Sequence, residues 1–196
     1  MNAPIQKPAV TSIPISAILQ NRWSPRVFDE IHVVTDGDVM ALAEAARWAP
    51  SSNNFQPWKF AFLKRGTEEF NQISKTGLTG FNQTWAPKAS LYVVVLADQK
   101  RPDGSDWDKA IAFYNAGLAS AQVVIQAESM GLRAHYMGGI VHEEVLEILE
   151  VADSWAVNIL AIGLQGSHGA ASADLQARET APRERKSLEE IVVLGL

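Results

Sequence analysis

The chain has 196 residues, of which 47% are hydrophobic and 20% are charged, and its formal net charge is -5. These values predict one globular domain with a sizeable core and exclude a chain that is disordered throughout. The negative charge argues against a general nucleic-acid or membrane-surface binder, and the lack of cysteine excludes disulfides and thiolate chemistry. Because neither a bilayer-length apolar run nor a signal-peptide pattern is evident, we expect a cytoplasmic protein.

The chain begins with an arm that we expect to be flexible. Residues 1–13 hold polar side chains and prolines, and we assign residues 14–196 to a single domain. Thr11 or Ser12 is placed to cap a short helix that runs through Leu19.

A short polar segment with two arginines follows this helix. If the segment is extended, Arg22, Ser24 and Arg26 face the same side, because side chains alternate along an extended chain. Two guanidinium groups and a hydroxyl then form a cradle for an anion. A surface turn with solvated arginines is the alternative that the spacing leaves open.

A run of hydroxyl and amide side chains comes after the second predicted helix. That helix is capped by Thr35 or Asp36 and ends near Trp48, because Pro50 biases the residue before it away from helical geometry. A packed core does not need so many hydrogen-bonding side chains in a row. We therefore predict that this loop is one wall of a site for a flat polar ligand, and it reads Pro50-Ser51-Ser52-Asn53-Asn54-Phe55-Gln56-Pro57.

The remaining elements follow from periodicity and from glycine and proline positions. Strands are expected at residues 58–63, 91–97 and 156–164, and the tail at 188–196 is strand-like. Residues 132–140 begin as a short strand and finish in a double glycine. Helices are expected at residues 67–75, 108–130 and 141–150. Residues 79–88, 99–107 and 167–182 have no clear period. The helix at 108–130 is rich in small residues, which suits either the core of a monomer or close packing against a second subunit.

This element order favours an α+β layered fold, because the strands do not alternate regularly with helices. Several standard sites are absent from the sequence, among them the Rossmann fingerprint, the P-loop and the Gly-x-Ser-x-Gly elbow. We expect no metal site, because no histidine has a second ligand at motif spacing; the histidines are His32, His135, His142 and His168. The arginines, amides and glycines suit a phosphorylated planar cofactor, which would carry the chemistry.

Six segments together resemble the FMN-dependent nitroreductase family. They stand in the order that is typical of the family and cover nearly the whole chain after residue 14. They are Arg22 to Phe28, Ala49 to Trp58, Phe81-Asn82, the alanine-rich helix ending near Gly131, Met137-Gly138-Gly139, and Arg183 to Val192. The resemblance implies a three-layer α-β-α sandwich with a central, mainly antiparallel sheet. It also implies an intertwined homodimer whose FMN sites are shared across the interface.

The resemblance further implies a role for individual residues in holding FMN without a covalent bond. Arg22 and Ser24 resemble the family's contacts to the phosphate and ribityl chain, and Arg26 resembles the cation near the pyrimidine edge. Asn82 resembles the amide that reads the pyrimidine ring. The other cofactor-binding positions are Trp23 beside the cradle, Met137, Gly138 and Gly139 near flavin N5, Arg183 and Arg185 as a second phosphate clamp, and Pro50, Ser51, Ser52 and Asn54, which reach the partner's flavin.

The activity implied is reduction of nitroaromatics, quinones or similar electrophiles by NAD(P)H, in two-electron ping-pong transfer through flavin N5. A different flavin reaction on this scaffold, such as dehalogenation, flavin fragmentation or heterocycle oxidation, stays open, as does a non-catalytic flavin-binding module. Trp23 and Trp85 stand where relatives have basic residues or a histidine, and the segment from Met137 lacks an acidic residue that some relatives have. Substrate preference therefore does not carry over.

Overall fold

Four antiparallel strands form the middle layer of the protein. In the computed structural model, which describes residues 4–195, the strands are β1 (Trp58–Lys64), β2 (Leu91–Asp98), β3 (Arg133–Met137) and β4 (Ser154–Gly163). Their order in the sheet is β1-β2-β4-β3, and every neighbouring pair is antiparallel. The central strand β2 is buried along almost its whole length, as its continuous apolar run predicts.

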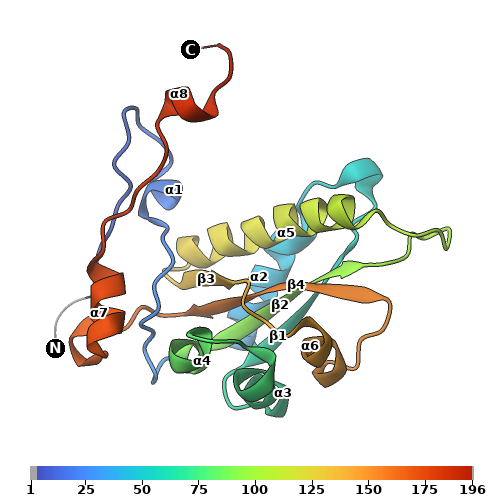
Figure 1. The fold of residues 1–196 in the computed structure, drawn as a ribbon, viewed down its shortest axis with the longest axis horizontal. Helices are drawn as coiled ribbons and strands as arrows, with labels where there is room; N and C mark the ends of the chain where they lie inside the picture. The colour runs from blue at the N-terminus through green and yellow to red at the C-terminus, as the bar shows by residue number, and fades with distance from the viewer. Residues whose placement is uncertain (1–3, 196) are drawn as a thin grey trace.

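Helices cover both faces of the sheet (Figure 1). One face carries α2 (Asp36–Arg47) and α5 (Lys109–Ser129); the other carries α3 (Glu68–Gln72), the π-helical turn η2 (Ile73–Gly77), α4 (Asn82–Trp85), the turn η3 (Ala86–Lys88) and α6 (His142–Ile148). Alternate residues of β2 serve the two cores: Val93 and Val95 pack with α5, whereas Tyr92 and Val94 pack on the opposite face. The predicted three-layer α+β sandwich with an antiparallel sheet is confirmed.

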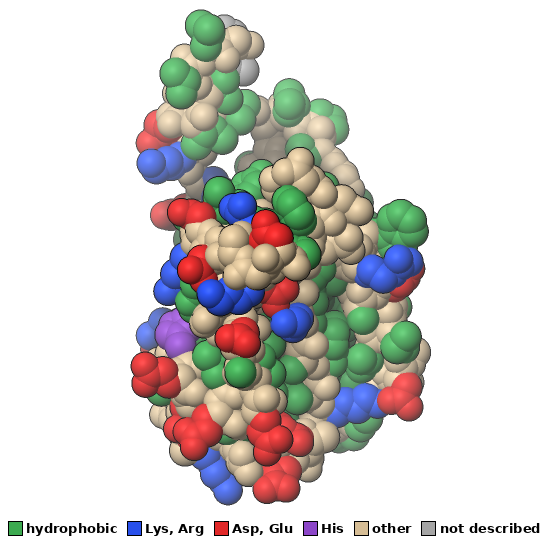
Figure 2. All heavy atoms as spheres, turned by 90° about the vertical axis from the view of Figure 1, so that its right-hand side faces the viewer, with side chains coloured by type: hydrophobic (Ala, Val, Ile, Leu, Met, Phe, Trp, Pro, Cys, Tyr) green, Lys and Arg blue, Asp and Glu red, His purple; other side chains and the backbone are tan. Residues whose placement is uncertain are grey.

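Two segments from opposite ends of the chain lie side by side at one edge of the molecule. The N-terminal segment precedes α1 (Ala17–Asn21), and the C-terminal segment contains η4 (His168–Ala170), α7 (Ala173–Thr180) and α8 (Leu188–Ile191). Arg183 Nη1 donates to the carbonyl oxygens of Lys7 at 2.5 Å and of Gln20 at 3.0 Å. Beyond these contacts the C-terminal segment projects from the body (Figure 1), and it carries exposed hydrophobic side chains (Figure 2), among them Leu188, Ile191, Val193 and Leu194. The expected flexibility of residues 1–13 stays a prediction.

Several expectations differ from the structure, and residues 79–88, which showed no clear period, contain α4 and η3. The first helix begins at Ala17 with Ser16 at its N-cap, not at Thr11 or Ser12, because Pro14 favours extended backbone before it. Residues 167–182 contain the helix α7, whose start is capped by Ser172. The tail expected as a strand instead forms α8, because Ser187 and Glu190 make a capping box and, among the described residues, no sheet edge pairs with it.

The helix α5 lies against the sheet and α2 and leaves one stripe of its surface uncovered. By length and composition alone it could cross a membrane, contrary to expectation, yet 44% of its apolar window is buried inside the protein. Its uncovered stripe carries Ile111 and Tyr114, which are 43% and 67% exposed, together with the small residues Gly117 and Ala121. A packed inner face with an apolar outer stripe is suited to contact with another protein surface.

Candidate functional site

The segment after α1 opens a basic cavity between the two ends of the chain. Arg22 has extended backbone and ends the helix, and its Nη1 lies 3.5 Å from Ser24 Oγ. The cavity, of about 210 Å³, is lined by side chains from four segments: Lys7, Arg22, Trp23, Ser24, Arg26, Arg178, Pro182, Arg183, Glu184 and Arg185. The structure thus brings together the three residues of the predicted cradle and both arginines of the predicted second clamp. Converging guanidinium groups are suited to a phosphate.

The cations that line this cavity repel one another. Burial lowers the pKa of Arg183, and the neighbouring charges of Arg22 and Arg185 lower it further. Burial and the charge of Arg178 likewise lower the pKa of Arg26. A doubly charged anion among these groups would relieve the repulsion, so the cavity favours a phosphate monoester over a neutral ligand.

A buried histidine holds the backbone of the cradle from the sheet side. His135, on β3, lies 3.0 Å through Nδ1 from the carbonyl oxygens of both Ser24 and Pro25. Since both partners are acceptors, Nδ1 must carry the proton. Burial, with the charge of Arg26, lowers the pKa of His135 from 6.5 to about 4, so the ring is neutral at pH 7.

A second group of predicted residues meets where α4 approaches the end of β3. An isolated bridge between Leu78 and Ile140 and a 3.0 Å bond from Thr79 N to Gly139 O hold the two segments together. Asn82 Nδ2 lies 3.4 Å from Gly139 O. A Cβ at Gly139 would lie 2.8 Å from Thr79 Oγ1 and 3.1 Å from Asn82 Nδ2, so a larger residue there requires these two side chains to move.

The two consecutive glycines at this point expose their backbone. Within residues 4–195, the amide N–H groups of Gly138 and Gly139 donate to no protein acceptor. No heavy atom lies within 4 Å of where a Cβ of Gly138 would stand. These amides are therefore available as donors to a ligand, whereas the side chain of Met137 is buried beneath them and can contribute only packing or backbone contacts.

The hydroxyl and amide loop does not line the basic cavity, and its hydrogen bonds go elsewhere. Its backbone is fixed to α5, because Ser52 N donates to the buried Asn115 Oδ1 at 2.9 Å, and Gln56 N donates to Ser51 Oγ at 3.0 Å. Asn53 and Asn54 have left-handed φ angles of 48° and 56°, which asparagine tolerates better than most residues. No hydrogen bond within the described part of the chain joins residues 50–54 to the basic cavity or to Gly138 and Gly139.

Trp23 and Trp85, where the sequence departs from the family pattern that it resembles, lie in different surroundings. Trp85 is completely buried, stacks against Phe28 and packs at a tilt against His135, at ring separations of 6.2 and 4.6 Å, so it belongs to the core. Trp23 is also buried, but the Lys7 ammonium lies 4.5 Å from its ring centre at the edge of the basic cavity.

Sequence reasoning missed Lys7, His135, Arg178 and Glu179 as neighbours of the basic cavity. Lys7 lies in the arm that we expected to be flexible, and Arg178 and Glu179 lie in a helix that was not predicted. His135 stands alone in its strand without motif spacing. No local signal identifies Lys7, His135 or Glu179, because they are joined to the cavity by contacts between distant segments. Arg178 lines the cavity from α7.

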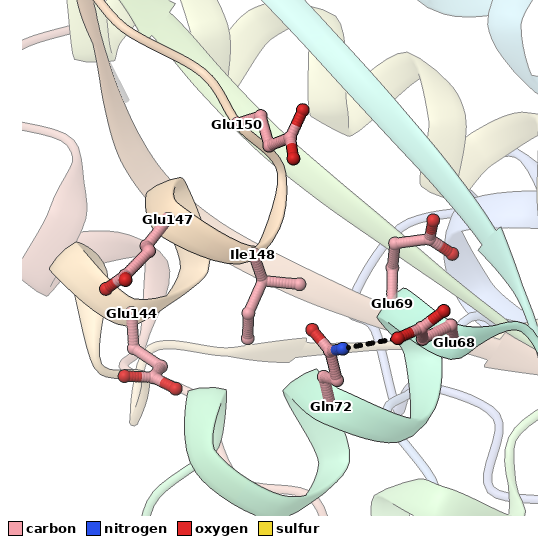
Figure 3. A pocket seen from close by; sticks show the side chains of 7 residues that line it. All are labelled: Glu68, Glu69, Gln72, Glu144, Glu147, Ile148 and Glu150. Carbon is pink, nitrogen blue, oxygen red and sulfur yellow. Dashed lines mark hydrogen bonds between the residues drawn. The ribbon is translucent and has the colours of Figure 1, made fainter.

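A second cavity is acidic and lies elsewhere. It measures about 450 Å³ between α3 and α6 (Figure 3) and is lined by Glu68, Glu69, Gln72, Glu144, Glu147, Ile148 and Glu150. Figure 2 shows acidic side chains gathered on the lower part of the molecule. Within residues 4–195, no group of three or more potential metal ligands is placed to hold an ion. Five carboxylates disfavour a phosphorylated ligand, so this cavity is not a candidate for the predicted cofactor.

Comparison with known proteins places the chain among its relatives. The model of the nitroreductase family matches residues 19–164. The chain belongs to the nitroreductase family. It is 26% identical over 193 residues to YdgI of Bacillus subtilis (79% of this chain, 90% of the other), a protein provisionally named an NAD(P)H nitroreductase. It is 30% identical over 100 residues to the major NAD(P)H-flavin oxidoreductase of Aliivibrio fischeri, covering 50% of this chain and 45% of that one.

A solved structure supports the same relationship over the full length. The structure is described as an oxidoreductase containing FMN, and it superposes with a TM-score of 0.87 at 28% identity. The match covers 100% of this chain and 98% of the other. Within this nitroreductase-family chain, the basic cavity and the glycine pair are thus parts of a fold that carries FMN in a relative.

Proposed function

We propose that the protein is an FMN-dependent oxidoreductase that takes electrons from NAD(P)H. The observation that carries this proposal is the basic cavity, in which Arg22, Ser24 and Arg26 meet Arg183 and Arg185 from the other end of the chain. This donor set fits the phosphate of FMN, because several guanidinium groups and a hydroxyl converge on one small volume. We propose that the flavin is bound without a covalent bond, because the chain has no cysteine and no histidine lines the basic cavity.

The other contacts would orient the ring system. The side-chain amide of Asn82 would hydrogen-bond to the pyrimidine ring. The backbone N–H groups of Gly138 and Gly139 would donate to the flavin near N5. The resemblance implies Arg26 near the pyrimidine edge, but here it lines the basic cavity with the other arginines, so we assign it to the phosphate. These residues bind and orient the cofactor.

When bound, FMN supplies the two-electron hydride chemistry. The proposed acceptors are nitroaromatics, quinones or similar electrophiles. Donor and acceptor would use one pocket in turn, a ping-pong order that requires no side-chain nucleophile. That requirement agrees with a site made of amides, glycines and arginines.

We further propose a homodimer in which each flavin site is completed by the partner's loop at residues 50–54. The loop is exposed and bound to α5, and α5 presents an apolar stripe with Tyr114 and Gly117 beside it. The projecting C-terminal segment exposes Leu188 and Ile191, which is typical of a segment that packs against a second subunit. Both surfaces support an intertwined assembly.

An absorption spectrum of the purified protein tests the flavin assignment first. We expect a yellow protein, or one that becomes yellow with a visible flavin spectrum when FMN is added. A protein that stays colourless and binds no FMN would contradict the proposal. Anaerobic addition of NADH or NADPH should then bleach the flavin, and a set of nitroaromatics and quinones should restore its colour. A flavin that neither nucleotide bleaches would favour a non-catalytic binding module or a different flavin reaction.

A further inference from the structure

A buried glutamate lies directly behind the basic cavity. Glu179, near the end of α7, is 1% exposed. Its Oε1 accepts a 2.7 Å hydrogen bond from the backbone N–H of Arg26. Within the described residues its Oε2 has no hydrogen-bond partner. A carboxyl group is expensive to bury, so its position behind the predicted phosphate site calls for an explanation.

The same residue joins three segments that line the cavity. The backbone oxygen of Glu179 accepts from Lys7 Nζ at 2.9 Å, and the backbone oxygen of Lys7 accepts from Arg183 Nη1 at 2.5 Å. The Glu179 carboxyl holds the cradle, its carbonyl holds the N-terminal segment, and that segment holds the arginine of the C-terminal clamp. Glu179 thus connects the cradle, the N-terminal segment and, through that segment, the C-terminal clamp.

Glu179 also interacts electrostatically with the cations around the cavity. Burial lowers the pKa of Lys7, as does the charge of Arg183, and Glu179 opposes both effects. Burial raises the pKa of the Glu179 carboxyl, while the Arg26 N–H and the charges of Arg26 and Lys7 oppose that rise. The glutamate therefore offsets part of the repulsion among the cations, and it does so without itself lining the cavity.

We propose that Glu179 is a positioning residue for the flavin phosphate: by accepting the Arg26 N–H it holds the Arg22–Arg26 segment in the conformation that binds the phosphate. The inference rests on the proposed function and deepens it. Glu179 does not touch the cofactor, and it acts through the backbone of the cradle. Its removal should therefore weaken the phosphate contacts selectively and leave the ring contacts in place.

Comparing FMN with riboflavin separates positioning from general stability, because riboflavin lacks only the phosphate. For Glu179→Ala we expect the affinity for FMN to fall about tenfold, as for loss of a charged hydrogen bond. The affinity for riboflavin should stay within about twofold, the range of a surface substitution. Glu179→Gln keeps an oxygen acceptor for Arg26 and should restore most of the FMN affinity. Glu147→Gln makes the same charge change on an exposed residue of the acidic cavity and serves as the control.

Each outcome decides the inference. Equal losses of FMN and riboflavin affinity, or an unchanged ratio between them, would overturn the positioning role. If Glu179→Ala does not fold, Glu179→Asp draws the carboxyl back by one methylene while keeping its charge, and the same change in the FMN-to-riboflavin ratio is expected. If the unsubstituted protein binds FMN and only the variants fail to discriminate, the proposed function stands and this inference falls. If the unsubstituted protein binds neither flavin, the proposed function itself falls.

Discussion

At the scale of single residues, Gly139 offers a sharp test of the flavin ring contacts. A methyl group at this position would meet Thr79 Oγ1 at 2.8 Å and the Asn82 amide at 3.1 Å, and these neighbours must move. We expect Gly139→Ala to displace Asn82 and raise the Kd for FMN about tenfold, the equivalent of one lost hydrogen bond of about 1.5 kcal/mol. Fluorescence titration measures this. Thr79→Ala in the same chain removes the closer clash and should recover part of the affinity; an unaltered Kd in Gly139→Ala would place the flavin elsewhere.

The phosphate clamp is tested by removing one arginine from each end of the chain. Arg22→Ala combined with Arg185→Ala should weaken FMN binding by several kcal/mol, because each charge-assisted contact contributes roughly 1.5–3 kcal/mol. The control pair Arg47→Ala and Lys100→Ala removes the same charge from exposed residues that pair with Glu44 and Asp106. Equilibrium dialysis of FMN compares the two double variants. Equal affinity in both would mean that the clamp is misplaced.

The buried His135 predicts a pH-dependent stability. Its pKa is about 4 in the folded protein and 6.5 when unperturbed, so between these values the unfolded chain binds a proton that the folded chain does not. Stability from the neutral ring is complete above pH 6.5 and is lost as the pH falls towards 4, by up to about 3 kcal/mol. In His135→Asn an amide can donate to the same carbonyls without titrating. Urea unfolding at pH 7 and pH 4.5 should show a smaller loss of unfolding free energy in the variant than in the parent; equal losses would contradict the assignment.

At the scale of elements, the sequence predicts those whose signals are local. The continuous apolar run at Leu91 predicts β2, and Asp108 and Gly131 bound α5 closely, since Asp108 accepts from the N–H of Ile111 and Gly131 adopts a φ of 77°. The helix α7 was missed because it buries only Leu175 and Glu179 and shows no apolar period. The tail from Leu188 was mistaken for a strand because its apolar run is typical of one. A strand also needs a sheet edge to pair with, and the run does not indicate whether such an edge is available.

The candidate site likewise combines contacts within one segment, which the sequence predicts, with contacts between distant residues, which it does not. The side-by-side placement of Arg22, Ser24 and Arg26 follows from alternation within one short segment, and the structure lines a cavity with all three. The contact between Glu179 and Arg26 joins residues 153 positions apart, and that between His135 and Ser24 joins residues 111 apart. Such pairs are decided by the packing of the whole chain, which no local pattern records.

The projecting C-terminal segment leads to a prediction about assembly. Val193 and Leu194 are almost fully exposed, and Ile191 is 61% exposed, so they contribute little to the stability of the subunit that carries them. A chain that stops after Lys186 should therefore unfold within about 1 kcal/mol of the full chain when both are compared as monomers, since exposed positions rarely contribute more. The dimer of the shortened chain should have a higher dissociation constant than the dimer of the full chain. Light scattering over a dilution series measures this, and an unchanged dissociation constant would remove the segment from the interface.

At the scale of the whole molecule, the separation of the residue 50–54 loop from the basic cavity makes the shared site testable by complementation. One variant carries Arg22→Ala and Arg185→Ala, and another carries Ser51→Ala and Asn54→Ala. In a mixed dimer with two-fold symmetry, both defects fall in one site and the other site is intact. Random assembly of equal amounts makes about half of the dimers mixed, so co-expression should restore about a quarter of the parental NAD(P)H oxidation to two variants that are each inactive. If the loop served its own subunit's flavin, every site in the mixture would carry one defect, and the activity would stay at the level of the separate variants.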